Sequence, residues 1–411
     1  MISSQELADR CAADPEFRLA ARYWDGGFAF VVDDDVTAVR VAGGQPSADP
    51  VTDGPGVVTF TGDAGVWDAI TSSPPPRFFN DIAFAAALGL QLGGDELTYW
   101  QYYPAVARAV ELLRPLTAGA AAPARSGKRF DSPVGRYVHL DLDGLDHRIY
   151  FEEAGTGIPL LMQHTAGSHG VQWRHLFEDE RITDHFRLIA YDLPFHGKSV
   201  PPSGATWWAE PYRLTQARAM DLAVGLAGAL DLERPVFMGC SVGGLLALDL
   251  ARYRADVFRA VIAVEPALKV EGDLDDLKGF WHPQVSNEYK ARLMNGLMAP
   301  QSPEALRRET VWAYSCGWPP AFLGDLHFYL VDHDLREEAA AIDTGRVGVH
   351  LLTGEYDASA TIEHGQAAHD AIPGSTFDVM QGVGHFPMAE NPEAFIPRLL
   401  PILDDIRKNR S

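Results

Sequence analysis

The pattern of hydrophobic and polar positions divides the chain into two parts. In the first part, short runs such as Phe28–Val32 and Val57–Thr61 are rich in β-branched and aromatic residues, which is typical of strands. From Phe130 onward, short apolar runs alternate with stretches of helical pattern. Short apolar strands separated by helices predict a mainly parallel sheet covered on both faces.

The first part, residues 1–114, is predicted to be a separate α+β domain. The run Asp33–Asp35 is a turn signal and predicts a hairpin between the strands on either side. A proline break at Pro74–Pro76 separates the strands from the later helices. The predicted elements are a helix around 4–23, strands at Phe28–Val32, Val36–Val41 and Val57–Thr61, and helices at Phe78–Leu90 and Pro104–Leu113.

A second domain, residues 129–411, is expected to follow a linker at 115–128, whose residues are small and almost free of large apolar side chains. An opening hairpin is expected to turn at Asp143-Gly144. The predicted strands of an eight-stranded sheet are Arg136–Leu142, His147–Glu152, Ile158–Gln163, Phe186–Tyr191, Pro235–Met238, Ala260–Val264, Val347–Leu352 and Thr376–Val379.

A helical, aromatic-rich stretch at about 267–346 interrupts this alternation. An insertion at the C-terminal edge of a sheet is placed to cover a site there, so we interpret it as a cap. Each of its aromatic residues is expected to pack in the cap core more often than to touch substrate. They are Phe280, Trp281, Tyr289, Trp312, Tyr314, Trp318, Phe322, Phe328 and Tyr329.

Composition narrows the class of protein. The 411 residues carry 34 basic and 56 acidic side chains, a net charge of −22, which argues against nucleic acid and anionic membrane partners. No apolar run reaches the roughly 20 residues needed to span a bilayer, and the N-terminus lacks the pattern of a signal peptide. Three scattered cysteines fit a reducing compartment. We expect a soluble, cytoplasmic protein.

One short stretch has the pattern of a catalytic nucleophile. The run Val236–Met238 has strand character, Gly239-Cys240-Ser241-Val242-Gly243 follows, and a helical pattern begins just past Ser241. This is the G-x-S-x-G elbow, in which a strained strand-to-helix turn exposes a serine Oγ. The alternative is an ordinary helix N-terminus with a capping serine. Cys240 is expected to be a small buried residue and not a second nucleophile.

A serine hydroxyl needs a positioned base that is itself oriented by an acid. Two late strands end in suitable residues: Asp357 in Gly354-Glu355-Tyr356-Asp357, and His385 in Gly384-His385-Phe386-Pro387. The order serine, acid, histidine is that of the hydrolase elbow pattern. Glu355 and Glu265 remain rival acids, although Glu265 is expected to line the floor of the site or to lie behind it.

The oxyanion of an acyl-transfer intermediate needs two backbone N–H donors. One is expected from Val242, which follows the nucleophile, and the other from the loop after Ile158–Gln163. Ala166 is the candidate in that loop, with Thr165 as the alternative. Candidate substrate contacts are Trp173, Glu265, Trp281, Trp312 and Trp318.

Metal and cofactor signals are weak. His164, His169 and His196 lack an accompanying carboxylate or cysteine set, and the elbow glycines do not follow the dinucleotide-binding spacing. We therefore expect neither a metal nor a cofactor. His164 is expected to make a structural hydrogen bond beneath the oxyanion loop.

Together these motifs resemble the α/β-hydrolase fold over residues 130–405. The matching pieces are His164–Gly167, Asp192–Ser199, the elbow at Ser241, Gly354–Asp357 and Gly384–Pro387. Two positions depart from common forms of the family: Thr165 stands where glycine follows the first histidine, and Phe195 where glycine precedes the second. The resemblance implies an esterase, lactonase, thioesterase or carbon–carbon bond hydrolase without a cofactor. A serine nucleophile disfavours epoxide hydrolases and haloalkane dehalogenases, which use aspartate.

The expected function is a serine hydrolase that cleaves a carboxylic ester or lactone of a small to medium apolar or aromatic molecule through an acyl-enzyme. One alternative is a carbon–carbon bond hydrolase of ring-cleavage products, and another is an inactive ligand-binding or carrier protein. The first domain resembles sterol-carrier-like domains at Gly56–Asp63 and Val66-Trp67. That resemblance implies an apolar tunnel or, in a degenerate copy, a packing or homodimer module.

Overall fold

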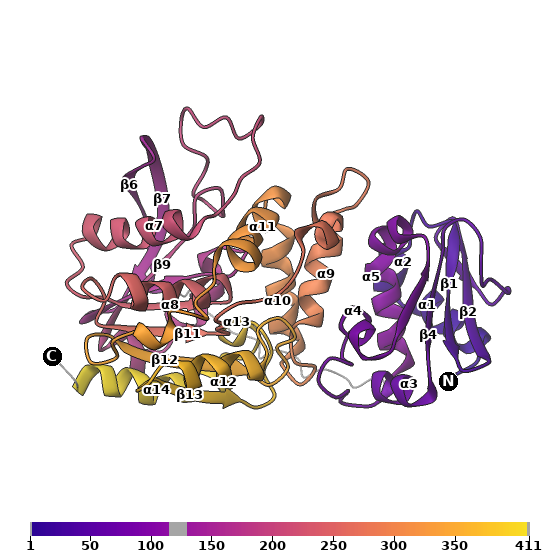
Figure 1. Ribbon diagram of the computed structural model, residues 1–411. Coiled ribbons are helices and arrows are strands. Elements are labelled where there is room, and N and C mark those ends of the chain that lie inside the picture. The colour runs from indigo at the N-terminus through magenta and orange to yellow at the C-terminus, as the bar shows by residue number, and fades with distance from the viewer. Residues whose placement is uncertain (1, 115–129, 409–411) are drawn as a thin grey trace. The chain divides into compact units, whose positions relative to one another are not determined.

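The computed structural model describes residues 2–114 and 130–408 (Figure 1). The predicted linker, 115–128, lies outside the described residues. Contacts group residues 2–114 with Gly279–Gln301 in one compact unit, and residues 130–278 with 302–408 in a second. This division differs from the predicted one, which assigned the whole stretch 267–346 to the second domain.

The first unit is a five-stranded sheet with helices. Strand β1 pairs with β2 in an antiparallel hairpin through Asp33–Asp35 and with β4 in parallel, and the strand order is β3-β2-β1-β4-β5. Its elements are α1 (Ser4–Ala13), α2 (Pro15–Ala20), β1 (Gly26–Val32), β2 (Asp35–Ala42), β3 (Gln45–Ser47), β4 (Val57–Gly62), α3 (Ala64–Thr71), α4 (Ile82–Ala85), η1 (Ala86–Leu88), β5 (Gln91–Gly94), α5 (Glu96–Leu113) and α9 (Glu288–Gly296).

The helices of this unit differ from prediction in two places. The helix expected over 4–23 is broken at Asp14, whose carboxylate accepts from the N–H of Phe17 and caps α2, while Pro15 cannot continue the preceding helix. The helix expected at Phe78–Leu90 shrinks to α4 and one short turn, and β5 follows it.

Aromatic side chains fill the core of the first unit. Trp24, Phe28, Phe30 and Trp67 are almost completely buried there. Tyr289 of α9 joins them, with its ring centroid 5.4 Å from that of Tyr103 on α5. The prediction that Tyr289 packs in a separate cap core is therefore wrong. The resemblance to sterol-carrier-like domains and the dimer role stay predictions.

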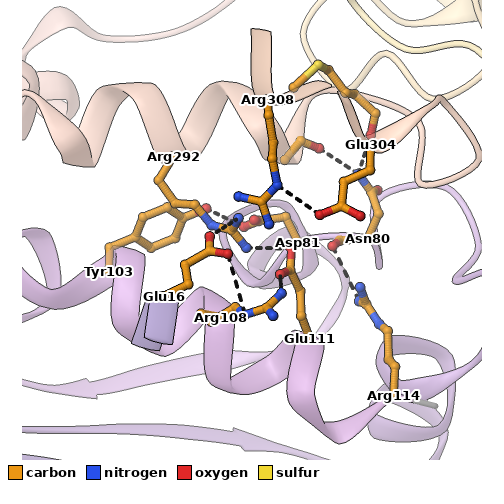
Figure 2. Close-up of polar contacts among 12 residues, drawn as sticks. Glu16, Asn80, Asp81, Tyr103, Arg108, Glu111, Arg114, Arg292, Glu304 and Arg308 are labelled. Carbon is orange, nitrogen blue, oxygen red and sulfur yellow. Dashed lines mark hydrogen bonds and ion pairs between the residues drawn. The ribbon is translucent and has the colours of Figure 1, made fainter. Parts of the chain in front are cut away.

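A charged network also holds α9 in the first unit (Figure 2). Arg292 contacts Glu111 of α5 at 2.6 Å, and Arg108 contacts the other oxygen of Glu111 at 2.9 Å. Burial by itself would raise the pKa of Glu111, but Arg292 and Arg108 lower it to about 2. The Asn80 amide adds a hydrogen bond to the Gly296 carbonyl at the end of α9. Segments far apart in sequence are thus joined by partly buried ion pairs.

The second unit contains an eight-stranded sheet in the order β13-β12-β11-β10-β8-β9-β7-β6. Strands β8 to β13 pair in parallel, while β6 and β7 form the predicted antiparallel opening hairpin. The strands are β6 (Val134–Leu142), β7 (Leu145–Ala154), β8 (Ile158–Gln163), β9 (Phe186–Tyr191), β10 (Val236–Cys240), β11 (Ala260–Val264), β12 (Gly348–Gly354) and β13 (Thr376–Met380). The fold class predicted from the sequence is confirmed.

Helices cover both faces of this sheet, which explains why its strands are continuously apolar. Alternate side chains of β8 to β11 share one core with η2 and α14, whereas α7 and α8 contact each other and the strands from the other face. The helices are η2 (Gly170–Leu176), α6 (Glu180–Thr183), α7 (Gln216–Ala229), α8 (Val242–Tyr253), α10 (Glu304–Ser315), α11 (Pro319–Leu326), η4 (His327–Asp332), η5 (Ala339–Ala341), α12 (Ile362–Ala371), α13 (Pro387–Glu390) and α14 (Pro392–Lys408). The short η3 (Leu274–Trp281) begins in this unit, and its last three residues belong to the first. Among the described helices, none is long and apolar enough to cross a bilayer.

Candidate active site

Ser241 lies in a sharp turn between β10 and α8. Its backbone has φ 59° and ψ −114°, a region that a residue with a side chain rarely adopts. The turn is tight, because a Cβ on Gly239 would come within 2.3 Å of the Gly243 carbonyl oxygen. The Ser241 N–H donates to the Val264 carbonyl of β11 at 3.0 Å and fixes the turn to the sheet. The chain therefore holds Ser241 in the strained conformation expected of a nucleophile elbow.

Asp357 and His385 meet after β12 and β13, as the sequence predicts for neighbouring strand ends. The Nδ1 of His385 lies 2.7 Å from Oδ2 of Asp357, and both side chains are buried. The other carboxylate oxygen, Oδ1, accepts the N–H groups of Ser359 and Ala360 at 2.7 and 3.1 Å. These bonds fix the carboxylate, so Nδ1 carries the proton and Nε2 keeps a lone pair for a reacting group.

The loop of His385 is also joined to the elbow. The Cys240 thiol donates to the His385 carbonyl at 3.2 Å. Within the described part of the chain, no direct hydrogen bond connects Ser241 to the imidazole. Such bonds are commonly long before substrate binds.

The two rival acids have other partners. Glu355 accepts the Gly382 N–H at 2.8 Å and braces the histidine loop. Glu265 is fully buried at the end of β11, and both its oxygens accept the Gly354 N–H, at 2.9 and 3.0 Å. Burial and the neighbouring Asp357 raise the pKa of Glu265 well above its usual range. A neutral Glu265 beside Asp357 fits the expected place behind the site.

In the loop after β8, the backbone N–H groups on either side of Ala166 are already engaged. The Thr165 N–H donates to Gln172 Oε1 at 3.0 Å, and the Gly167 N–H donates to Asp325 Oδ2 at 2.8 Å. Among the hydrogen bonds of the described residues, the Ala166 N–H has none. Val242 is the first residue of α8, where N–H groups lack a partner within the helix. This geometry favours Ala166 over Thr165.

Asp325 of α11 fixes this loop, although no sequence motif pointed to this residue. Besides the Gly167 N–H, it contacts His196 Nε2 at 2.8 Å and accepts the Tyr212 hydroxyl at 3.2 Å. Burial by itself would lower the pKa of His196, but Asp325 raises it above the ordinary value. Because 158 positions separate Asp325 from Gly167, no local pattern could have found the contact.

His164 acts as a structural hydrogen-bonding group. Its Nδ1–H donates to the Thr165 carbonyl at 2.7 Å, and its Nε2 accepts the Leu193 N–H at 3.0 Å. Burial and the neighbouring His196 lower its pKa well below the usual value, which keeps the ring neutral. With both nitrogens engaged, His164 has no lone pair for a metal. The structure gives no group of three or more candidate metal ligands among the residues it describes.

The candidate tryptophans occupy very different positions. Trp173 is fully buried in the core between the sheet and α14, a position that favours packing over substrate contact. Trp312 and Trp281 are 69% and 53% exposed. Trp318 stacks on Phe195 with ring centroids 5.9 Å apart and an angle of 24°. Phe195 has φ 72°, so this bulky residue keeps the left-handed conformation for which glycine is usual.

Comparisons with known proteins support the same fold. The model of the "Alpha/beta hydrolase family" matches residues 160–398. An uncharacterised protein of Mycobacterium tuberculosis (strain ATCC 25618 / H37Rv) is 27% identical over 61% of this chain and 76% of its own. A pimeloyl-[acyl-carrier protein] methyl ester esterase of Vibrio vulnificus (strain YJ016) is 25% identical over 61% of this chain and 96% of its own.

Solved structures show the same architecture at low identity. A thermophilic esterase from Thermogutta terrifontis superposes with a TM-score of 0.57 at 22% identity, covering 66% of this chain and 99% of that one. The enol-lactonase from Burkholderia xenovorans LB400 gives a TM-score of 0.53 at 20% identity, covering 65% and 100%. At these identities the likeness concerns the fold alone.

Proposed function

Because this chain belongs to the alpha/beta hydrolase family, we propose that it is a serine hydrolase that cleaves a carboxylic ester or lactone through an acyl-enzyme. The observation that carries the proposal is the strained Ser241 turn beside a buried, hydrogen-bonded pair of Asp357 and His385. A strained serine at a helix N-terminus is costly to maintain, and nucleophilic catalysis is the role that makes use of it.

In the proposed mechanism Ser241 Oγ attacks the carbonyl carbon while His385 Nε2 takes its proton. Asp357 keeps the imidazole oriented and stabilises the cation that forms. The N–H groups of Val242 and Ala166 hold the oxyanion. His385 then returns the proton to the leaving alcohol. In deacylation a water molecule attacks the acyl-enzyme while His385 takes its proton, and the acid is released as the proton returns to Ser241 Oγ.

An apolar or aromatic substrate is supported by the side chains on the Phe195 loop. Phe195 packs against Trp318 and Tyr212, with ring centroids 5.9 and 4.9 Å away, which gives an aromatic surface after β9. The Vibrio relative is named as a methyl ester esterase, and the same bond type is proposed for this chain. The ester panel for testing it should therefore include methyl esters with apolar acyl chains.

The test is the Ser241→Ala variant, assayed on that panel and with a fluorophosphonate label. We expect turnover to fall by about 10⁴-fold or more, because the remaining groups supply only binding and oxyanion stabilisation. The label should attach to the wild-type protein at Ser241 and not to the variant. Ser315→Ala, a change of an exposed serine on α10, is the matched control and should keep both properties.

Two results would overturn the proposal. A wild-type protein that takes no fluorophosphonate label would instead support an inactive ligand-binding role. Unchanged ester turnover by Ser241→Ala would show that another group performs the chemistry. Cleavage of a vinylogous diketo acid with no ester turnover would favour the carbon–carbon bond hydrolase.

A further inference from the structure

The loop after β8 makes a tight turn at the candidate oxyanion donor, Ala166. The Ser168 N–H donates to the Thr165 carbonyl at 3.3 Å and closes the turn. Gly167 occupies the third position of the turn with φ 63°, where glycine is favoured because it has no Cβ. Any group that fixes this turn therefore also fixes the direction of the Ala166 N–H.

Helix α11 packs directly against this turn. A Cβ on Gly167 would lie 2.6 Å from Cδ2 of the Phe322 ring. Asp325 follows Phe322 by three residues on the same face of the helix, and its Oδ2 accepts the Gly167 N–H at 2.8 Å. The helix is itself held in place, because the Leu214 N–H donates to the Gly324 carbonyl at 2.9 Å. The position of the turn therefore depends on α11.

The buried carboxylate of Asp325 has a fixed orientation. Its Oδ2 also contacts His196 Nε2 at 2.8 Å, and its Oδ1 accepts the Tyr212 hydroxyl at 3.2 Å. The other ring nitrogen of His196, Nδ1, lies 2.9 Å from the Pro194 carbonyl. Since both ring nitrogens face acceptors, both carry hydrogen and the ring is an imidazolium. Two donors besides the Gly167 N–H, one of them charged, therefore keep the carboxylate facing the turn.

We propose that Asp325 is a positioning residue for the oxyanion hole, which keeps the Ala166 N–H aligned for catalysis by holding the N–H of the next residue, Gly167. This inference rests on the proposed function. Oxyanion donors are effective when they are fixed before charge develops, because no free energy is then spent on reorganising them. The Thr165 N–H, on the other side of Ala166, is held by Gln172 Oε1 at 3.0 Å. Asp325 supplies the second anchor, and it acts through the turn and not on the reacting atoms.

The test compares Asp325→Ala with Asp249→Ala. Each variant removes a fully buried carboxylate that contacts a buried histidine, at 2.8 Å for His196 and 2.9 Å for His333. Asp249 lies in α8, and its other oxygen accepts from the Gln216 amide and not from the loop after β8. The two variants should therefore lose similar stability, while only Asp325→Ala should lose the alignment of the oxyanion donor.

We expect Asp325→Ala to lower kcat on the ester panel by about 10- to 100-fold, which is less than the complete loss of one oxyanion donor. KM should change by less than about threefold, because the carbonyl oxygen gains its negative charge only in the transition state. Asp249→Ala, in which the turn keeps both anchors, should stay within about threefold of wild type in kcat.

A second measurement reports the oxyanion hole without turnover. It is the affinity for a trifluoromethyl ketone with an octyl chain, divided by that for the corresponding methyl ketone. The trifluoromethyl ketone forms a stable tetrahedral adduct with a serine and so presents an oxyanion, whereas the methyl ketone does not. This ratio of affinities should fall together with kcat in Asp325→Ala and stay at the wild-type value in Asp249→Ala.

A wild-type kcat and affinity ratio in folded Asp325→Ala would overturn this inference and leave the proposed function standing. Equal losses in both variants would also contradict it, because they would report destabilisation and not alignment. A wild-type protein that takes no fluorophosphonate label would overturn both proposals.

If Asp325→Ala does not fold, Asp325→Asn provides the decision. The carboxamide keeps the size of the side chain, but its neutral oxygen is a weaker acceptor than a carboxylate. A fall in kcat of about threefold or more at constant KM would support the positioning role, and an unchanged kcat would contradict it.

Discussion

The two units bury carboxylates in opposite ways. In the first unit, Glu111 lies between Arg292 and Arg108, and its pKa falls to about 2. In the second, Glu265 lies beside Asp357, and its pKa rises well above the usual range. The first carboxylate is therefore charged in the folded protein at neutral pH, while the second keeps its proton.

This difference teaches what each buried carboxylate does. An ion pair joins elements that the sequence keeps far apart, as Arg292 of α9 and Glu111 of α5 do. A neutral carboxylic acid can lie beside Asp357 without adding a second negative charge, so the charge near His385 stays on the residue that orients it. In the first unit a charged carboxylate joins α5 to α9, and in the second the negative charge is restricted to the proposed catalytic acid, Asp357.

The largest expected effect comes from Arg292→Met, which leaves Glu111 without its closest cation. We expect a cost of roughly 3 kcal/mol, at the lower end of the range for one-sided loss of a buried pair, because the pair is partly exposed and Glu111 keeps Arg108 as a second partner. Amide hydrogen exchange should become faster in the peptides of α5 and α9, which reports the loss of local stability. The exchange rates of α8 and α14 in the second unit should stay unchanged. Arg336→Met removes pairs that are exposed, and should change stability by less than about 1 kcal/mol. Equal protection from exchange in Arg292→Met and wild type would contradict the interpretation that this ion pair joins α9 to α5.

A smaller effect is expected from Glu111→Gln, with a defined pH dependence. The folded pKa of Glu111 is about 2 against an ordinary value of 4.5, so its contribution is fully present above about pH 4.5 and is lost as the pH falls toward 2. The variant should be about 2 kcal/mol less stable at pH 7, in line with the loss of a charge-assisted bond. Denaturant titrations from pH 7 to 3 should show the difference shrinking, and a constant difference would count against the ion pair.

The smallest effect is expected from Glu265→Gln, which keeps the shape of the neutral acid. At pH 5 its stability should differ from wild type by less than about 1 kcal/mol. Since the folded pKa of Glu265 is raised, the unfolded chain loses this proton first as the pH rises above 4.5, and wild-type stability falls through that window. The glutamine variant lacks this pH dependence, so its free energy of unfolding should rise relative to that of wild type between pH 5 and 8. A loss of several kcal/mol at pH 7 would mean that Glu265 is charged in the folded state.

Local sequence patterns predicted the second unit better than the first. Its strands are buried on both faces, so each appears as a short apolar run, and all eight were expected near their observed positions. In the first unit, Pro15 broke a helix that the apolar pattern continued, and the glycine-rich strand Gln91–Gly94 was missed. Both failures occur where a single residue or a backbone pairing overrides side-chain periodicity.

Prediction of the site followed the same rule. Ser241, Asp357 and His385 each follow a strand within a recognisable local motif, so their order along the chain was sufficient to propose them as candidates. Asp325 belongs to a helix of the insertion, and nothing in its sequence neighbours marks it. Its position depends on contacts with Gly167, His196 and Tyr212, which only folding brings together.

The sequence by itself determined the strand-turn-helix geometry of the elbow and the order of the proposed nucleophile, acid and base, because each lies in a motif of only a few neighbouring residues. Only the tertiary structure decided that α9 packs with the first unit, that Asp325 fixes the loop after β8, and that Glu265 keeps its proton beside Asp357. Each of these depends on groups that are distant in sequence and on water excluded from between them. Burial and long-range electrostatics exist only in the folded chain, and they fix the protonation and position of the groups around Ser241.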